Sequence, residues 1–277
     1  MKYFLLILIF ILVALFLSVE VIYKQEQEDS VKGVIIAPTM QISSTLAPTP
    51  TFTPTPIHIP FVTLRKASYS IAIFGDSMVD TMGENLEYLQ KVLANKYPQT
   101  KFNLYNYGVG GQNVEQGLAR FESSFVNRER QYSPLPALTP DVLIIASFAY
   151  NPFPTHDRNR HYSLLRDLIA KAKNVSSNVY LLAEIAPLKT GFGKGKNGIN
   201  MTDEAALEHA THIIEQLDDV INLSKEASIP LINAYYKSRI DGSFGDPYFV
   251  NRDDGIHPSV AGHFLTAELI VENIKLD

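Results

Sequence analysis

The chain has 277 residues, a net charge of −5, 46% hydrophobic and 19% charged residues, and no cysteine. This apolar content is typical of a globular protein with a sizeable core, and the acidic balance argues against a nucleic-acid partner. The lack of cysteine excludes disulfides, thiolate nucleophiles and thiolate metal ligands.

The N-terminal segment is strongly hydrophobic. Residues 3–23 are apolar except for Ser18 and Glu20, which is close to the roughly 20 residues that a helix needs to cross a bilayer. We therefore predict a transmembrane anchor over residues 1–23. A cleavable signal peptide is the alternative, but its apolar region is shorter and ends in a small-x-small cleavage site, which we do not find here.

A segment rich in proline and threonine follows. Residues 37–60 read APTMQISSTLAPTPTFTPTPIHIP, and such a composition favours extended polyproline II structure of about 3.1 Å per residue. We predict that residues 24–64 form a semi-rigid linker between the membrane and an extracytoplasmic domain. The protein would be secreted instead if the N-terminal segment were cleaved.

Residues 65–277 alternate between short apolar runs and amphipathic stretches, which predicts one α/β domain with a largely parallel sheet. Right-handed crossovers would then cover both faces of the sheet with helices, and ligands would bind at the carboxyl ends of the strands. The predicted strands are residues 70–74, 102–107, 142–148, 178–183 and 230–234, and the predicted helices are 85–97, 162–172, 204–225 and 259–274.

The first predicted strand ends at Gly75-Asp76-Ser77. Ser77 therefore lies at the sheet edge where such folds place their sites, and Gly75 permits a sharp turn there. As a lone motif, these residues are equally typical of a polar turn in which Asp76 or Ser77 caps a helix.

A second polar cluster lies in the last predicted loop, where Asp254 precedes His257 by three residues. Serine hydrolysis needs an imidazole that accepts the hydroxyl proton and a carboxylate that orients the imidazole. One loop offers both groups. Together with a serine at a strand end, they favour a catalytic role over a structural one.

Oxyanion donors could come from two further strand ends. The second strand is followed by the glycine-rich turn at residues 106–113, and the third by Asn151. The glycine run alone is weak evidence, because such runs are common in turns.

These motifs, in this order, resemble the four sequence blocks of the SGNH hydrolases, also called the GDSL esterase/lipase family. The blocks are Gly75-Asp76-Ser77, the run ending at Gly111, Asn151, and Asp254 with His257. The resemblance spans about residues 69–275. It implies a flavodoxin-like three-layer sandwich whose five-stranded parallel sheet has the order 2-1-3-4-5.

The resemblance also implies catalytic roles. Ser77 would be the nucleophile, His257 the base and Asp254 the residue that orients it. The backbone N–H groups of Ser77 and Gly111 and the side-chain amide of Asn151 would form the oxyanion hole.

The third block departs from the family pattern. Ala149 and Pro152 stand where the family usually has glycine and aspartate. Pro152 has no N–H and restricts Asn151 to extended geometry, so the support for the Asn151 amide must be built differently.

Several other residues have less specific patterns. Tyr150, Phe153, His156 and His161 follow the third strand and are candidates for lining the substrate pocket, although packing explains them equally well. His209 and His212 lie three apart on a predicted helix, where a solvated face is a better interpretation than a metal site. The glycine-rich residues 188–200 are interpreted as a mobile segment beside the site.

We thus expect a membrane-tethered, extracytoplasmic serine esterase that removes short acyl groups, most plausibly acetyl, from carbohydrate. Its substrate would be an acylated polysaccharide or a small ester, and it would need no metal or organic cofactor. Two alternatives stay open: an O-acetyltransferase with the same triad, and a non-catalytic carbohydrate-binding domain.

Overall fold

The computed structural model describes residues 64–276. The predicted anchor and nearly all of the predicted linker lie outside this range. Within it, no helix has the length and apolar character needed to cross a membrane.

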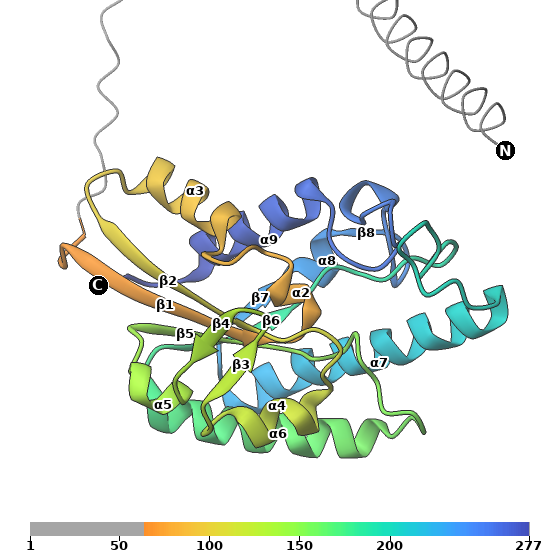
Figure 1. Ribbon diagram of the computed structural model, residues 1–277, viewed down its shortest axis with the longest axis horizontal. Coiled ribbons are helices and arrows are strands. Elements are labelled where there is room, and N and C mark those ends of the chain that lie inside the picture. The colour runs from red at the N-terminus through yellow and green to blue at the C-terminus, as the bar shows by residue number, and fades with distance from the viewer. Residues whose placement is uncertain (1–63, 277) are drawn as a thin grey trace, which may run out of the picture. The chain divides into compact units, whose positions relative to one another are not determined.

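A five-stranded parallel sheet forms the centre of the described domain (Figure 1). Its spatial order, β2-β1-β5-β6-β7, is the predicted order 2-1-3-4-5 when only these strands are numbered. The α/β class and the topology are therefore confirmed. The strands are β1 (Ser68–Gly75), β2 (Lys101–Gly108), β5 (Val142–Ala146), β6 (Val179–Ala183) and β7 (Leu231–Asn233).

Helices cover both faces of the sheet and complete a three-layer sandwich (Figure 1). On one face, α3 (Glu87–Lys96) packs against α9 (Val260–Asn273). On the other face, α6 (Arg158–Val175) packs against both α4 (Val114–Arg120) and α7 (Asp203–Ala227).

Short elements connect these layers. Two hairpins extend beyond the main sheet, β3 (Phe125–Asn127) with β4 (Arg130–Tyr132) and β8 (Arg239–Asp241) with β9 (Phe244–Gly245). The sequence analysis predicted neither hairpin. The remaining elements are α2 (Ser77–Asp80), α5 (Leu135–Leu138), α8 (Ala234–Lys237) and the 3-10 helix η1 (Pro247–Phe249).

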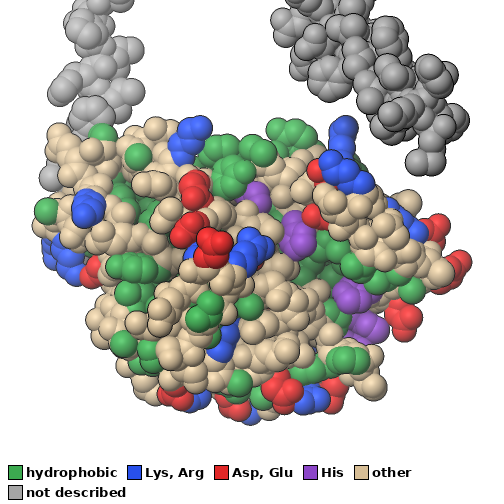
Figure 2. Space-filling view, in the orientation of Figure 1, with side chains coloured by type: hydrophobic (Ala, Val, Ile, Leu, Met, Phe, Trp, Pro, Cys, Tyr) green, Lys and Arg blue, Asp and Glu red, His purple; other side chains and the backbone are tan. Residues whose placement is uncertain are grey.

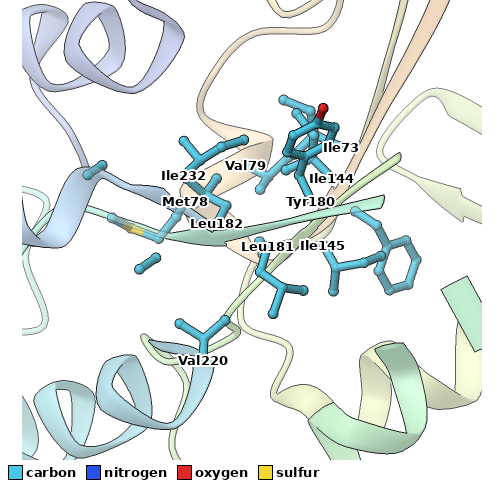
Figure 3. Packing of buried hydrophobic residues seen from close by; sticks show 14 of the residues in the cluster. Ile73, Met78, Val79, Ile144, Ile145, Tyr180, Leu181, Leu182, Val220 and Ile232 are labelled. Carbon is cyan, nitrogen blue, oxygen red and sulfur yellow. The ribbon is translucent and has the colours of Figure 1, made fainter. Parts of the chain in front are cut away.

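The core lies on both faces of the central strands. Ile73, Ile144 and Tyr180 are neighbours in register across β1, β5 and β6, while Ile145 and Leu181 form the next row on the opposite face (Figure 3). All five side chains are almost completely buried. Burial of each contributes about 1.5–3 kcal/mol, which explains why strands covered on both sides read as continuous apolar runs.

Capping residues determine where the helices begin. The Asp157 side chain accepts a hydrogen bond from the Arg160 N–H, so α6 begins four residues before the predicted start at residue 162. Asn113 and Gln116 form a capping box at the start of α4. This second cap fixes α4 directly behind the glycine-rich turn that follows β2.

Candidate active site

A pocket of about 650 Å³ lies beyond the carboxyl ends of β1, β2 and β5. Four of the residues predicted for catalysis line it: Ser77, Gly111, Asn151 and His257. They come from four separate loops. The parallel sheet brings these loops together because its strand ends share one edge.

Ser77 begins helix α2 directly after β1. A Cβ atom at Gly75 would lie 2.4 Å from the Val79 side chain and 2.7 Å from that of Ala146, so the turn requires glycine. Asp76 then caps α2 by accepting a hydrogen bond of 2.9 Å from the Met78 N–H. The two interpretations of this motif, as a helix-capping turn and as a site with a nucleophilic serine, are thus compatible. Asp76 caps the helix, and Ser77 lines the pocket.

Asp254 orients the imidazole of His257. The His257 Nδ1 lies 3.0 Å from Asp254 Oδ2. Asp254 Oδ1 accepts backbone hydrogen bonds from Ile256 and His257, at 2.7 and 2.9 Å. A carboxylate in this setting accepts a hydrogen bond from Nδ1–H, which leaves the lone pair on Nε2. Within residues 64–276, Nε2 has no protein hydrogen-bond partner, so it can accept a proton from the pocket side.

The glycine-rich residues 188–200 pack against the loop that carries His257. The Gly193 N–H donates to the Gly255 carbonyl at 3.2 Å, and the Asn197 N–H donates to the Asp253 carbonyl at 2.8 Å. Gly255 has a φ of +67°, and a Cβ there would lie 2.3 Å from the Gly191 carbonyl oxygen. The segment lies beside the site as predicted, and backbone hydrogen bonds join it to the histidine loop.

Three N–H groups predicted to form the oxyanion hole belong to residues that line the pocket. The backbone N–H groups of Ser77 and Gly111 make no hydrogen bond within the described chain, and Gly111 adopts a φ of +75° that suits glycine. The Asn151 Nδ2 donates to Asp76 Oδ2 at 2.9 Å, which leaves its second hydrogen free. The Asp76 carboxylate therefore supplies the support that Pro152, without an N–H, cannot give.

A buried polar network lies beneath the loop of Asn151. The Ser147 N–H and hydroxyl both donate to the Glu184 carboxyl group. The Ser147 carbonyl accepts a bond of 2.9 Å from His161 Nε2, and His161 Nδ1 lies 3.1 Å from Asp219 Oδ2. Arg158 pairs with the other oxygen of Asp219 at 2.7 Å. This chain of contacts ties the end of β5 to α6 and α7.

Two buried carboxyl groups of this region, Glu184 and Asp76, interact electrostatically. Burial, and secondly the negative charge of Asp76, raise the pKa of Glu184 to about 8. Burial also raises the pKa of Asp76, but hydrogen bonds from the Met78 N–H and the Asn151 amide oppose that shift. Because the pKa of Glu184 is about 8 despite its own two donors from Ser147, we place the proton on Glu184 and the negative charge on Asp76 at neutral pH.

Of the residues predicted to line the substrate pocket, the structure places only Tyr150 in its wall. Tyr150 lines the pocket, and its hydroxyl donates to the Ile185 carbonyl at 2.8 Å. Phe153 and His156 do not line it, contrary to prediction. Phe153 is buried with the Arg160 guanidinium 4.4 Å from its ring, and His156 pairs with Glu215 at 2.6 Å.

The structure also corrects the predictions for His161 and His209. His161 belongs to the buried network rather than to the pocket. His209, predicted on a solvated face, is half-buried, lines the pocket and stacks on Phe192 with ring centroids 5.5 Å apart. Burial lowers the pKa of His209.

Figure 2 shows histidine side chains gathered on this face of the molecule. His212 stacks on His156 with ring centroids 3.8 Å apart. Within residues 64–276, no group of three or more histidine or acidic side chains is arranged to hold a metal ion.

Sequence reasoning missed further residues that line the pocket. Arg128, Phe192 and Ile199 all contribute to its wall. The last two lie in residues 188–200, whose position beside the site was predicted without naming these side chains. Arg128 comes from the turn of the β3–β4 hairpin, for which the sequence analysis found no signal.

Comparison with solved structures shows the same fold at low sequence identity. A lipase/acylhydrolase from Enterococcus faecalis matches with a TM-score of 0.56 and 17% identity over 76% of this chain and 98% of that one. A GDSL-like lipase from Bacteroides thetaiotaomicron gives 0.54 and 16%, over 74% and 86%. The acetylxylan esterase Axe2 from Geobacillus stearothermophilus gives 0.53 and 17%, over 76% and 95%.

Comparison of the sequence itself gives the family. No protein of curated function matches the chain. The model of the GDSL-like lipase/acylhydrolase family matches residues 73–265, which include the strand-end serine and the loop of His257. The chain therefore belongs to the GDSL-like lipase/acylhydrolase family and is an ester-hydrolysing serine hydrolase.

Proposed function

We propose that the protein is a membrane-tethered, extracytoplasmic esterase that removes short acyl groups, acetyl above all, from carbohydrate through the triad Ser77, His257 and Asp254. One observation carries this proposal. A single pocket is lined by Ser77 and His257, and Asp254 is hydrogen-bonded behind the imidazole at 3.0 Å.

The chemistry follows from the protonation of His257. As the Ser77 Oγ forms a bond to the ester carbonyl carbon, its proton moves to His257 Nε2. The bond to the alkoxy oxygen then breaks, and His257 returns the proton to the leaving sugar hydroxyl. Water attacks the acyl-enzyme by the same route in reverse and releases the carboxylic acid and free Ser77.

The negative charge that develops on the carbonyl oxygen needs donors in fixed positions. The N–H groups of Ser77 and Gly111 and the free amide hydrogen of Asn151 supply them in this proposal. Asp76 holds the Asn151 amide, so this donor does not have to reorient during the reaction.

Two observations support an acetylated carbohydrate as substrate. Solved structures with the same fold include enzymes named acetyl xylan esterases. The pocket of about 650 Å³ is also large enough for a sugar unit, and the half-buried ring of His209, which stacks on the buried Phe192, forms part of its wall.

The proposed location depends on the sequence alone. An apolar segment over residues 1–23 would anchor the chain, and the proline- and threonine-rich linker would carry the domain outside the membrane. Fractionation of cells tests this proposal: we expect the protein in the membrane fraction and accessible to externally added protease. Recovery as a cytosolic protein would contradict it.

Covalent labelling tests the catalytic proposal. We expect a fluorophosphonate probe to label the full-length protein in detergent, and Ser77→Ala to abolish both labelling and hydrolysis of a chromogenic acetyl ester. Ser123, which is exposed and outside the pocket, provides the matched control Ser123→Ala, and this variant should behave as wild type. Absence of labelling in the folded wild-type protein would contradict the proposal and favour a binding domain.

A further inference from the structure

Arg128 is the charged side chain that the proposed chemistry leaves without a role. It lies at the turn of the β3–β4 hairpin, its side chain is 74% exposed, and it lines the pocket that contains Ser77. Among residues 64–276, Arg128 is the only lysine or arginine that lines this pocket. Every other lining residue is neutral, acidic or histidine.

The ion pairs of Asp80 leave a positive charge at this edge of the pocket. Asp80 is almost completely buried and already pairs with Arg130 and with the Asn127 amide through Oδ1. Arg128 reaches the other oxygen, Oδ2, at 3.1 Å. Two guanidinium groups thus share one carboxylate, and the more exposed of them, Arg128, can pair with an incoming anion without leaving Asp80 unpaired.

The neighbouring glutamates do not line the pocket that contains Ser77. Glu84 and Glu129 line a separate depression together with Arg130 and Tyr132. Figure 2 shows basic and acidic side chains next to each other on this face.

The backbone gives a second, independent observation. Arg128 has a φ of +57°, in the left-handed region where hairpin turns ordinarily use glycine, asparagine or aspartate. A large side chain at this position costs backbone free energy that glycine would not. The sequence nevertheless places there an arginine, which lines the pocket and pairs with Asp80.

The amides near Arg128 are neutral groups. Asn113 and Gln116 also line the pocket, and in the capping box of α4 each side-chain oxygen accepts a hydrogen bond from the other residue's backbone N–H, so that only their uncharged NH2 groups could donate to an anion. Arg128 is therefore the group on this wall best able to bind a planar anion, since its guanidinium matches a carboxylate in a bidentate geometry.

We propose that Arg128 recognises a carboxylate on the sugar unit that carries the acyl ester, so that the preferred substrate is an acylated acidic polysaccharide of the uronate type. This inference rests on the proposed esterase function. It concerns specificity alone: Arg128 positions the substrate, and the bond-breaking steps stay with Ser77 and His257.

A matched pair of substrates tests this proposal. Acetate release is measured on O-acetylated polygalacturonate and on the same polymer with its carboxyl groups methyl-esterified, using the full-length protein in detergent. For wild type, we expect kcat/KM to be about tenfold higher on the free acid, the size of one exposed charge-assisted contact. Added salt should reduce this preference because it screens the exposed contact.

The decisive variant is Arg128→Gly. It removes the guanidinium and also relieves the backbone at φ +57°, so its Tm should equal or exceed that of wild type while the preference for the free acid falls to about unity. Activity on the methyl ester should fall much less than activity on the free acid. Arg166→Gln, at an exposed position of α6 outside the pocket, is the control and should keep the preference.

Other outcomes separate the two proposals. Equal loss on both polymers, or an unchanged preference for the free acid in Arg128→Gly, would overturn the role of Arg128. Failure of the wild-type protein to release acetate from either polymer or from the chromogenic ester would overturn the esterase proposal itself.

Discussion

Two aspartate–histidine pairs lie in this domain, and they differ in their surroundings rather than in their own contact. The Nδ1–Oδ2 distance is 3.0 Å in His257–Asp254 and 3.1 Å in His161–Asp219. The side chains of the first pair are 26% and 14% exposed, whereas those of the second are 1% and 2% exposed. The contact alone therefore does not make a histidine a catalytic base.

The second ring nitrogen makes the difference. In His161, Nε2 donates to the Ser147 carbonyl, while Nδ1 faces Asp219, which Arg158 keeps paired as a carboxylate. Both ring nitrogens of His161 thus contact buried protein atoms, and neither faces the pocket. In His257, Nε2 has no partner within the described residues and faces the pocket. A general base needs this free lone pair, whereas both ring nitrogens of a structural histidine contact protein groups.

Replacement of His257 provides the largest test of this comparison. We expect His257→Ala to lower kcat/KM for an acetyl ester by at least about a thousandfold, because no group remains to accept the Ser77 proton. Its Tm should change little, since the side chain is partly exposed. A variant with more than a tenth of wild-type activity would show that His257 is not the base.

Asp254→Asn separates orientation from folding in the same pair. An asparagine keeps the Oδ1 acceptor for the N–H groups of Ile256 and His257, so the loop should retain its fold. Its amide would face Nδ1 and favour the wrong tautomer, which should reduce kcat by about a hundredfold to ten-thousandfold. The check is single-turnover kinetics with a circular dichroism spectrum, and full activity with a native spectrum would contradict the role of Asp254.

The pocket pair could be predicted from sequence because each of its parts is local. Ser77 follows an apolar run, and Asp254 and His257 lie three residues apart in one loop. The five strands could be located in the same way, since a strand covered on both faces is a continuous apolar run. The strand order came from the family resemblance, which depends on those local motifs.

The buried pair could not be predicted in this way. His161 and Asp219 lie 58 residues apart on different helices, and their contact depends on how α6 packs against α7. No local sequence pattern predicts how these two helices pack. The β3–β4 hairpin, which carries Arg128, was missed because its three-residue strands are too short to show alternation. Phe153 and His156 were misplaced although Pro152 and Pro154 beside them line the pocket. The Phe153 ring is instead buried against Arg160, and His156 pairs with Glu215.

Replacement of His161 should affect stability rather than chemistry. His161→Leu removes two buried hydrogen bonds and leaves the Ser147 carbonyl without its donor, so we expect a loss of about 2–4 kcal/mol in the free energy of unfolding. At a temperature where the variant is folded, kcat/KM should stay within about tenfold of wild type. Urea unfolding and the acetyl ester assay measure the two effects.

A double variant provides the control for this prediction. In His161→Leu with Asp219→Asn, the carboxylate that has lost its histidine is also removed, so the double variant should lose less stability than the sum of the two single changes. Strict additivity would contradict the pairing. A thousandfold loss of activity in stable His161→Leu would place this histidine in the chemistry and remove the contrast with His257.

The smallest expected effect lies at the far end of the buried network, in the pH dependence conferred by Glu184. Burial and the charge of Asp76 raise the folded-state pKa of Glu184 to about 8, from an ordinary value of 4.5. Between these two pH values, the unfolded chain releases the proton and the folded protein keeps it, so this group makes stability fall as pH rises.

Glu184→Gln mimics the protonated form and does not titrate. Its Tm should lie near that of wild type at pH 5 and above it at pH 8, whereas the exposed control Glu272→Gln should follow wild type at both. Parallel pH profiles for Glu184→Gln and wild type would mean that Glu184 is ionised in the fold and would contradict this prediction.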